Sequence, residues 1–120
     1  LGLTPWVKFL GTRGDVAELL QAMDVFLFPS LFEGLSVASI EAQAAGLPVL
    51  ISDSVPIECR KTDLVHVLPL SAPPEEWADS VLELASIPRR NTYEEIRDAG
   101  FDVVENAKWL QAFYLQAAQR

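Results

Sequence analysis

The sequence predicts an α/β fold: a mainly parallel sheet of about four strands with flanking helices. Two observations predict it. Short apolar runs of strand length alternate along the chain with segments of helical periodicity, as in layered α/β domains. One run, at residues 24–29 (DVFLFP), is apolar almost throughout, which is typical of a strand covered on both faces. With 120 residues, the chain suits one domain with a single core.

Each element of this fold has its own signal. A helix is expected to open at Asp15, which can cap it together with Glu18 three residues later. The small, apolar segment 36–45 predicts a second helix, and Gly46 ends it. Residues 55–61 predict a turn or a short helix. The predicted strands lie at residues 6–10, 24–29, 48–52 and 64–68.

Beyond about residue 73 the pattern is helical. Pro73-Pro74 starts one helix, and a short second helix stops at Gly100. The capping-box pair Asp102 and Glu105 starts a third helix of about four turns with one apolar face. We expect the aromatic residues on these helices to pack in the core: Trp77, Trp109, Phe113 and Tyr114.

Composition limits the function. The net charge is −8 with no Lys- or Arg-rich block, which argues against nucleic-acid binding, since that needs cationic contacts to phosphates. No apolar run reaches the ~18–20 residues of a membrane span. The one cysteine, Cys59, leaves no internal disulfide and no cysteine metal cluster. Its presence as a single thiol fits a reducing cytoplasm.

The informative stretch is residues 29–53, PSLFEGLSVASIEAQAAGLPVLISD. It places Glu33 and Gly34 in a loop at the carboxyl end of a predicted strand, the edge where open α/β sheets bind ligands. Gly34 allows either close approach of the backbone or a positive φ. With the helix dipole, main-chain N–H groups there form an anion site. The groups expected to face the cleft belong to Gly34, Leu35, Ser36 and Val37.

Two glutamates accompany this anion site. Glu33 lies in the loop and Glu41 lies further along the predicted helix, with seven residues between them. Paired carboxylates accept hydrogen bonds from hydroxyl groups, so the expected ligand has both phosphate and sugar parts. Taken singly, Glu33 fits a solvated loop acid and Glu41 an exposed helix acid. Their spacing favours a shared site.

These motifs resemble the retaining family 4 glycosyltransferases of GT-B architecture, in which two Rossmann-like domains face each other across a cleft. The similarity lies in Pro-Ser-x-x-Glu-Gly, a second Glu after seven residues, and Ala-x-Ala-x-Gly-x-Pro-Val. Upstream, Val-Lys-Phe-Leu-Gly and Ala-x-Asp-Val-Phe match as well. The resemblance extends through Gly100-Phe101 and the helix that contains Trp109, so it covers nearly the whole chain.

The resemblance implies a role for each motif residue. Glu33 would be the catalytic-site glutamate that orients the donor sugar through its hydroxyls, not a nucleophile. Glu41 would hold the ribose hydroxyls, and the loop at Gly11 and Thr12 would touch the base. The family uses a nucleotide-diphosphate sugar as substrate, retains anomeric configuration and usually needs no metal, so no cofactor is expected. The groups that would meet the sugar and diphosphate belong to Gly34, Leu35, Ser36 and Val37.

Measured against that family, residues 1–120 are expected to form a partial donor-binding domain. The missing parts would be an N-terminal domain that binds a sugar or lipid-linked acceptor, and central strands with basic residues. We therefore expect little or no turnover from this chain alone. Segments 6–10 and 24–29 should either pair directly or accept a strand from another chain, and unpaired strand edges should favour self-association.

Two other functions stay open at this stage. One is a non-catalytic domain that binds nucleotide sugars or assists assembly. The other is a receiver-like signalling domain that uses Asp53, at the end of a predicted strand. His66 is interpreted as a core histidine, and Cys59 as a bystander without a basic partner. For the complete enzyme we expect a cytoplasmic location, peripheral to the membrane, and a role in polysaccharide or glycolipid synthesis.

Overall fold

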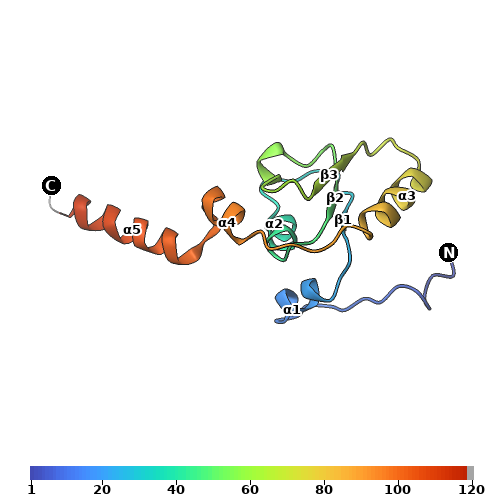
Figure 1. The fold of residues 1–120 in the computed structure, drawn as a ribbon, viewed down its shortest axis with the longest axis horizontal. Coiled ribbons are helices and arrows are strands. Elements are labelled where there is room, and N and C mark those ends of the chain that lie inside the picture. Colours follow the sequence, from blue (N-terminus) through green and yellow to red (C-terminus); the bar gives the residue numbers. More distant parts are fainter. Residues whose placement is uncertain (119–120) are drawn as a thin grey trace.

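The computed structural model describes residues 1–118 and shows an α/β core with two extended ends (Figure 1). The predicted alternation of strands and helices is confirmed. The elements, in chain order, are α1 (Val16–Gln21), β1 (Phe26–Phe28), α2 (Val37–Ala44), β2 (Val49–Ser52), the 3₁₀ turn η1 (Ile57–Cys59), β3 (Val65–Leu68), α3 (Pro74–Leu84), α4 (Tyr93–Ile96), the π-type turn η2 (Arg97–Phe101) and α5 (Val103–Ala117).

The sheet is parallel, with strand order β1-β2-β3. Phe28 of β1 is the register partner of Ile51 of β2, which in turn faces Val67 of β3. Parallel neighbouring strands require a crossover connection, and helix α2 provides it between β1 and β2. The parallel sheet is thus confirmed, with three strands in place of about four.

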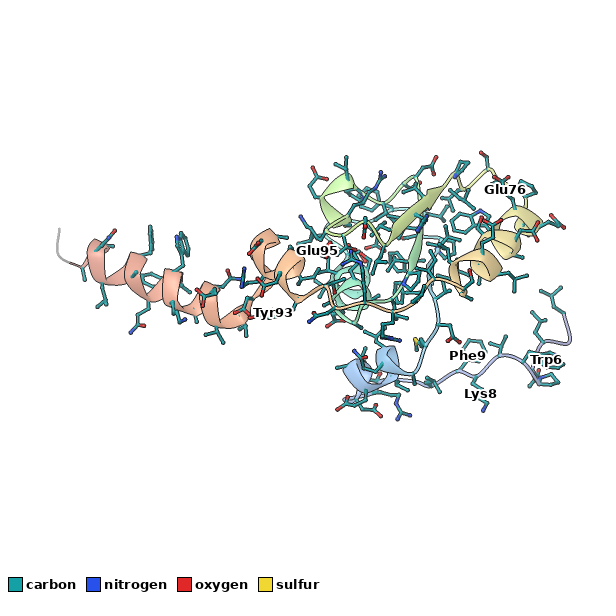
Figure 2. All side chains as sticks on the ribbon, viewed as in Figure 1. Trp6, Lys8, Phe9, Glu76, Tyr93 and Glu95 are labelled. Carbon is teal, nitrogen blue, oxygen red and sulfur yellow. The ribbon has the colours of Figure 1, made fainter. Side chains whose placement is uncertain are left out.

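Residues 6–10 form no strand, contrary to prediction. The N-terminal segment runs past the core, and the side chains of Trp6 and Phe9 project from it (Figure 2); they are 85% and 97% exposed. A strand forms only against a hydrogen-bonded neighbour, and within residues 1–118 the strand paired with β1 is β2 alone. Of the two alternatives for segments 6–10 and 24–29, direct pairing is therefore wrong, and a strand added by another chain stays a prediction.

The core lies around β2. Val49, Leu50 and Ile51 are each at most 1% exposed, so the central strand is covered on both faces. At β1 that expectation fails, because Leu27 is 48% exposed beside an apolar groove against Trp77 of α3. The residues that pack on the α2 face of the sheet include Leu20, Ala42, Leu47, Val55 and Cys59.

The predicted helix starts are correct, but only one of the two predicted carboxylate caps, at Asp15 and Asp102, forms within residues 1–118. Asp15 precedes α1, but its carboxylate receives hydrogen bonds from Arg13, with Nε to Oδ1 at 2.7 Å, and caps no N–H group. Asp102 does cap α5, accepting from the N–H groups of Val104 and Glu105 at 2.9 Å each. The Glu105 carboxylate pairs with Lys108 at 2.8 Å.

The C-terminal helix α5 extends away from the core (Figure 1) and has no buried residue. Core packing is therefore wrong for Trp109, Phe113 and Tyr114, which are 67%, 52% and 63% exposed. His66 is also exposed, on the face of β3 opposite to Val65 and Val67, and is not a core histidine. Trp77 is half-buried on α3. No helix within residues 1–118 combines the length and apolar character needed to cross a membrane.

Candidate functional site

The loop at residues 29–36 leaves the carboxyl end of β1 and leads into α2, so the structure puts it at the predicted edge of the sheet. Its first turn is fixed by Ser30, whose N–H donates to the carbonyl of Phe28 at 3.0 Å. Ser52, fully buried at the end of β2, donates through its hydroxyl to the carbonyl of Ser30. The neighbouring strand thereby holds the start of the loop.

Glu33 is partly exposed in this loop. Its Oε1 accepts a hydrogen bond from the hydroxyl of Ser30 at 2.8 Å, which orients the carboxylate. None of the ion pairs within residues 1–118 includes Glu33 or Glu41. Both carboxylates therefore keep lone pairs that can accept hydrogen bonds from ligand hydroxyls.

Helix α2 begins at the end of this loop. Ser36 is its N-cap, and its Oγ lies 3.4 Å from the N–H of Ser39, while the Ser39 hydroxyl donates to the Ser36 carbonyl at 2.9 Å. The expectation of four free N–H groups is wrong at Ser36, because its N–H donates to Sγ of Cys59 at 3.2 Å. The N–H groups of Gly34, Leu35 and Val37 have no hydrogen-bond acceptor in the described part of the chain.

Gly34 gives the loop an open approach. Its φ is not positive, so left-handed backbone does not explain the glycine. No heavy atom outside residues 33–35 lies within 4 Å of the position that a Cβ would take, and a ligand can therefore come close to the main chain. Leu35 and Val37 on either side of the cap are 52% and 59% exposed. This N-terminal turn, with unpaired N–H groups and a helix dipole, suits an anion.

Glu41 lies one turn further along α2. It is four residues after Val37, so the two share the exposed face of the helix. It also lines an open cavity of about 250 Å³ with Ala17 and Gln21 of α1 and with Ala44. Glu33 does not line this cavity: one glutamate precedes the first turn of α2 and the other follows it.

The structure leaves Gly11 and Thr12 apart from this cavity. Both are exposed and lie before α1, and neither is among the residues that line the space beside Glu41. Their contact with a nucleotide base stays a prediction.

Gln43 was not foreseen from sequence. Its side chain is fully buried, and its Nε2 donates to the carbonyls of Ser39 at 3.0 Å and Cys59 at 2.8 Å. Its Oε1 accepts from the N–H groups of Lys61 at 2.8 Å and Thr62 at 3.0 Å. The available signal was an amide within a helix of small apolar residues, because such a group needs buried partners.

Arg89 is a second residue that sequence reasoning missed. Its guanidinium donates to the carbonyls of Leu20 at 3.0 Å, Met23 at 2.7 Å and Ala45 at 2.6 Å. These carbonyls lie at the C-terminal ends of α1 and α2, where helices leave acceptors unpaired. Arg89 therefore links the C-terminal ends of α1 and α2, and two of the residues that it binds, Leu20 and Ala45, line the cavity beside Glu41.

The ionic contacts concentrate away from the loop. Arg90 forms ion pairs with both Asp63 and Glu95. The hydrogen bond from the Arg90 guanidinium to Glu95 lowers the pKa of the Glu95 carboxyl group. The same partners raise the pKa of Arg90. Within residues 1–118, no group of three or more His, Cys, Asp or Glu side chains is arranged to hold a metal ion.

Residues 1–86, which include the whole loop and α2, match the model of the glycosyl transferases group 1. The chain belongs to the glycosyl transferases group 1 family. The resemblance inferred from the Glu33–Glu41 stretch is thereby confirmed. Family membership gives no support to the receiver-like alternative, and Asp53 accepts a hydrogen bond from the N–H of Leu70 at 3.2 Å.

Individual relatives of this glycosyltransferase chain are bacterial. It is 41% identical to the candidate glycosyltransferase EpsF of Bacillus subtilis over 90% of this chain and 29% of EpsF. It is 32% identical to a D-inositol 3-phosphate glycosyltransferase of Corynebacterium aurimucosum, over 93% of this chain and 27% of that protein.

A third relative matches a shorter part of the chain. The chain is 50% identical over 53 residues to the UDP-Gal:alpha-D-GlcNAc-diphosphoundecaprenol alpha-1,3-galactosyltransferase of Escherichia coli, covering 44% of this chain and 14% of that enzyme. In each case the chain spans less than a third of the relative's length. No solved structure matches the chain.

Proposed function

We propose that this chain is the donor-binding part of a retaining glycosyltransferase, which transfers a sugar from a nucleotide diphosphate to a hydroxyl acceptor. One observation carries the proposal. Along the chain, the unpaired N–H groups at the start of α2 stand between Glu33 and Glu41, and neither carboxylate forms an ion pair within residues 1–118. A ligand that matches this pattern has an anionic centre flanked by two sets of hydroxyl groups.

The roles follow from the order of groups along the loop and helix. The N–H groups of Gly34, Leu35 and Val37 stabilise the negative charge on the diphosphate, including the charge that develops as the sugar leaves. Glu33 accepts hydrogen bonds from the sugar hydroxyls and orients the ring. Glu41, one turn along the same helix face as Val37, accepts from the ribose. Ser36 contributes as the cap that fixes the first turn.

The net charge of −8 does not oppose this proposal. Main-chain N–H groups and a helix dipole bind phosphate without a cationic side chain. The loop at residues 29–36 contains no Arg or Lys, so we assign the cationic clamp on the diphosphate to a further part of the complete enzyme. A separate N-terminal domain supplies the acceptor site, and the chain alone therefore turns over little or no substrate.

We assign the acceptor to polysaccharide or glycolipid synthesis. The Escherichia coli relative is named for a diphosphoundecaprenol acceptor, and a relative in Campylobacter jejuni, 47% identical over 47 residues, is also named for a diphospho-undecaprenol acceptor. By this analogy the complete enzyme works in the cytoplasm, peripheral to the membrane, on a lipid-linked sugar. Retention of anomeric configuration, by attack assisted by the leaving phosphate, is part of the same proposal.

The catalytic assignment is tested with Glu33→Ala in the complete enzyme. Loss of the carboxylate that orients the sugar lowers kcat/KM at least tenfold, equivalent to about 1.4 kcal/mol of transition-state binding. The matched control is Glu58→Ala, because Glu58 is an exposed glutamate on η1 outside the loop. Near-normal turnover in Glu33→Ala, or an equal loss in both variants, contradicts the role.

Donor binding is tested by thermal shift with a panel of UDP-glucose, UDP-galactose, UDP-N-acetylglucosamine and GDP-mannose. We expect at least one of them to raise Tm, because a ligand that binds only the folded state stabilises it. Glu41→Ala should remove most of that shift. An unchanged shift in Glu41→Ala contradicts the ribose contact, and turnover measurements then separate an enzyme from a non-catalytic binder.

A further inference from the structure

Cys59 and Gln43 are buried polar side chains that the donor contacts proposed above do not use. Each is 0% exposed. Cys59 is the last residue of η1, and Gln43 lies on the buried face of α2. Both make hydrogen bonds to main-chain groups of another segment, so each constrains a part of the backbone far from it in sequence.

Cys59 contacts the loop at residues 29–36 at two points. Its Sγ accepts from the N–H of Ser36 at 3.2 Å, and its thiol donates to the carbonyl of Gly34 at 3.6 Å. These two main-chain groups bracket Leu35. Within residues 1–118, the sulfur is the one partner outside the loop and α2 that forms hydrogen bonds with residues 34–36.

The sulfur is itself held by α2. Nε2 of Gln43 donates to the carbonyl of Cys59 at 2.8 Å, and Oε1 accepts from the N–H groups of Lys61 and Thr62. Gln43 therefore ties the chain on the C-terminal side of η1 to the same helix that presents Val37 and Glu41. The connection runs from α2 through Gln43 to Cys59 and returns to the N-terminus of α2.

We propose that Cys59, held by Gln43, is a positioning residue for the nucleotide-sugar donor. Its sulfur binds the N–H of Ser36 and the carbonyl of Gly34. The carbonyl of Gly34 and the N–H of Leu35 belong to the same trans peptide unit and point in opposite directions. Holding the carbonyl inward therefore turns the unpaired N–H of Leu35 outward, beside those of Gly34 and Val37. This inference rests on the proposed function. Its consequence is that the sulfur determines donor affinity without touching the donor.

The test is steady-state kinetics of Cys59→Ala in the complete enzyme, with the panel donor that stabilises the wild type. Loss of two hydrogen bonds that fix the loop should raise the donor KM about tenfold and leave the acceptor KM within about twofold. Cys59→Ser should restore the donor KM to within about threefold, because a hydroxyl also donates and accepts.

The matched control is Val55→Ala. Val55 is 1% exposed and belongs to the same apolar cluster, but its side chain offers the loop no hydrogen bond. It should lower Tm and leave the donor KM unchanged. If Cys59→Ala behaves like Val55→Ala, with a lower Tm and an unchanged donor KM, the positioning role is wrong and Cys59 only packs.

Two further outcomes are distinguishable. If Cys59→Ala does not fold, Cys59→Val fills the site without a polar group and should show the same rise in donor KM; a normal donor KM in that variant overturns the inference. If no nucleotide sugar of the panel binds the wild type, the proposed function fails and this inference fails with it. A wild type that binds, with Cys59→Ala binding equally well, overturns the inference alone.

Discussion

Strand β2 and helix α5 have comparably apolar sequences and opposite surroundings. In β2, Val49, Leu50 and Ile51 are at most 1% exposed, because helices cover both faces of the strand. In α5, Trp109 and Tyr114 are more than 60% exposed, and the helix extends into solvent. The hydrophobic pattern of an element therefore identifies the face that favours burial. It does not identify which other element covers that face.

The difference separates two sources of order. β2 is held by hydrogen bonds to a strand on each side and by a packed core. α5 is held by its own helical hydrogen bonds, by the Asp102 cap and by contact with η2. Substitutions in the two regions should therefore have very different effects on stability.

The largest effect is expected from Ile51→Ala in the centre of β2. Ile51 is 0% exposed, and truncating a buried Ile costs about 2–5 kcal/mol through lost burial and the cavity left behind. The matched variant is Leu115→Ala on α5, where the side chain is 59% exposed; it should change the free energy of unfolding by less than about 0.5 kcal/mol. Urea unfolding measures both, and similar shifts would break the comparison between the regions.

A second prediction concerns Gly46, at the end of α2. Its φ is +74°, and an added Cβ would lie 2.1 Å from the carbonyl oxygen of Arg90. Gly46→Ala should therefore cost at least about 2 kcal/mol, from left-handed strain and a clash with main chain. Gly14→Ala is the control, since its φ is not positive and no heavy atom outside residues 13–15 lies within 4 Å of the added Cβ. Equal free energies of unfolding for the two variants would show that the main chain of Arg90 does not stay close to Gly46.

Much of the central βαβ unit could be predicted because its signals are local. Ser36 caps α2, Gly46 ends it in the left-handed conformation, and the apolar run that follows forms β2. The strand predicted at residues 6–10 failed for a non-local reason. Its sequence has strand character, but no hydrogen-bonding neighbour lies beside it in residues 1–118.

The candidate site divides in the same way. Glu33, Gly34 and Glu41 could be selected from spacing along one loop and one helix. Cys59 could not, because its hydrogen bonds reach residues 23 and 25 positions away. Arg89 reaches Leu20 across 69 positions. Hydrogen bonds of this kind depend on how separate elements pack, and a single sequence contains no direct signal for that packing.

The smallest effect is expected at the start of α5, from Asp102. Hydrogen bonds from the N–H of Glu105 and the hydroxyl of Tyr93 lower the pKa of its carboxyl group. A lowered folded-state pKa means that the cap stabilises the helix fully above the unfolded value of about 3.9, and that this contribution is lost as the pH falls through the folded value. The first turn of α5 should therefore open in acid, while β2 stays protected.

Amide hydrogen exchange at Val104 and Glu105 measures this opening. Asp102→Ala should speed exchange at both positions at neutral pH, because their N–H groups lose an acceptor. Asp102→Asn is the control, since an amide oxygen caps without a carboxyl proton. Its exchange should stay slow at neutral pH and lose the acid-dependent step. If wild type and Asp102→Asn open at the same acidic pH, a group other than Asp102 controls the opening of α5.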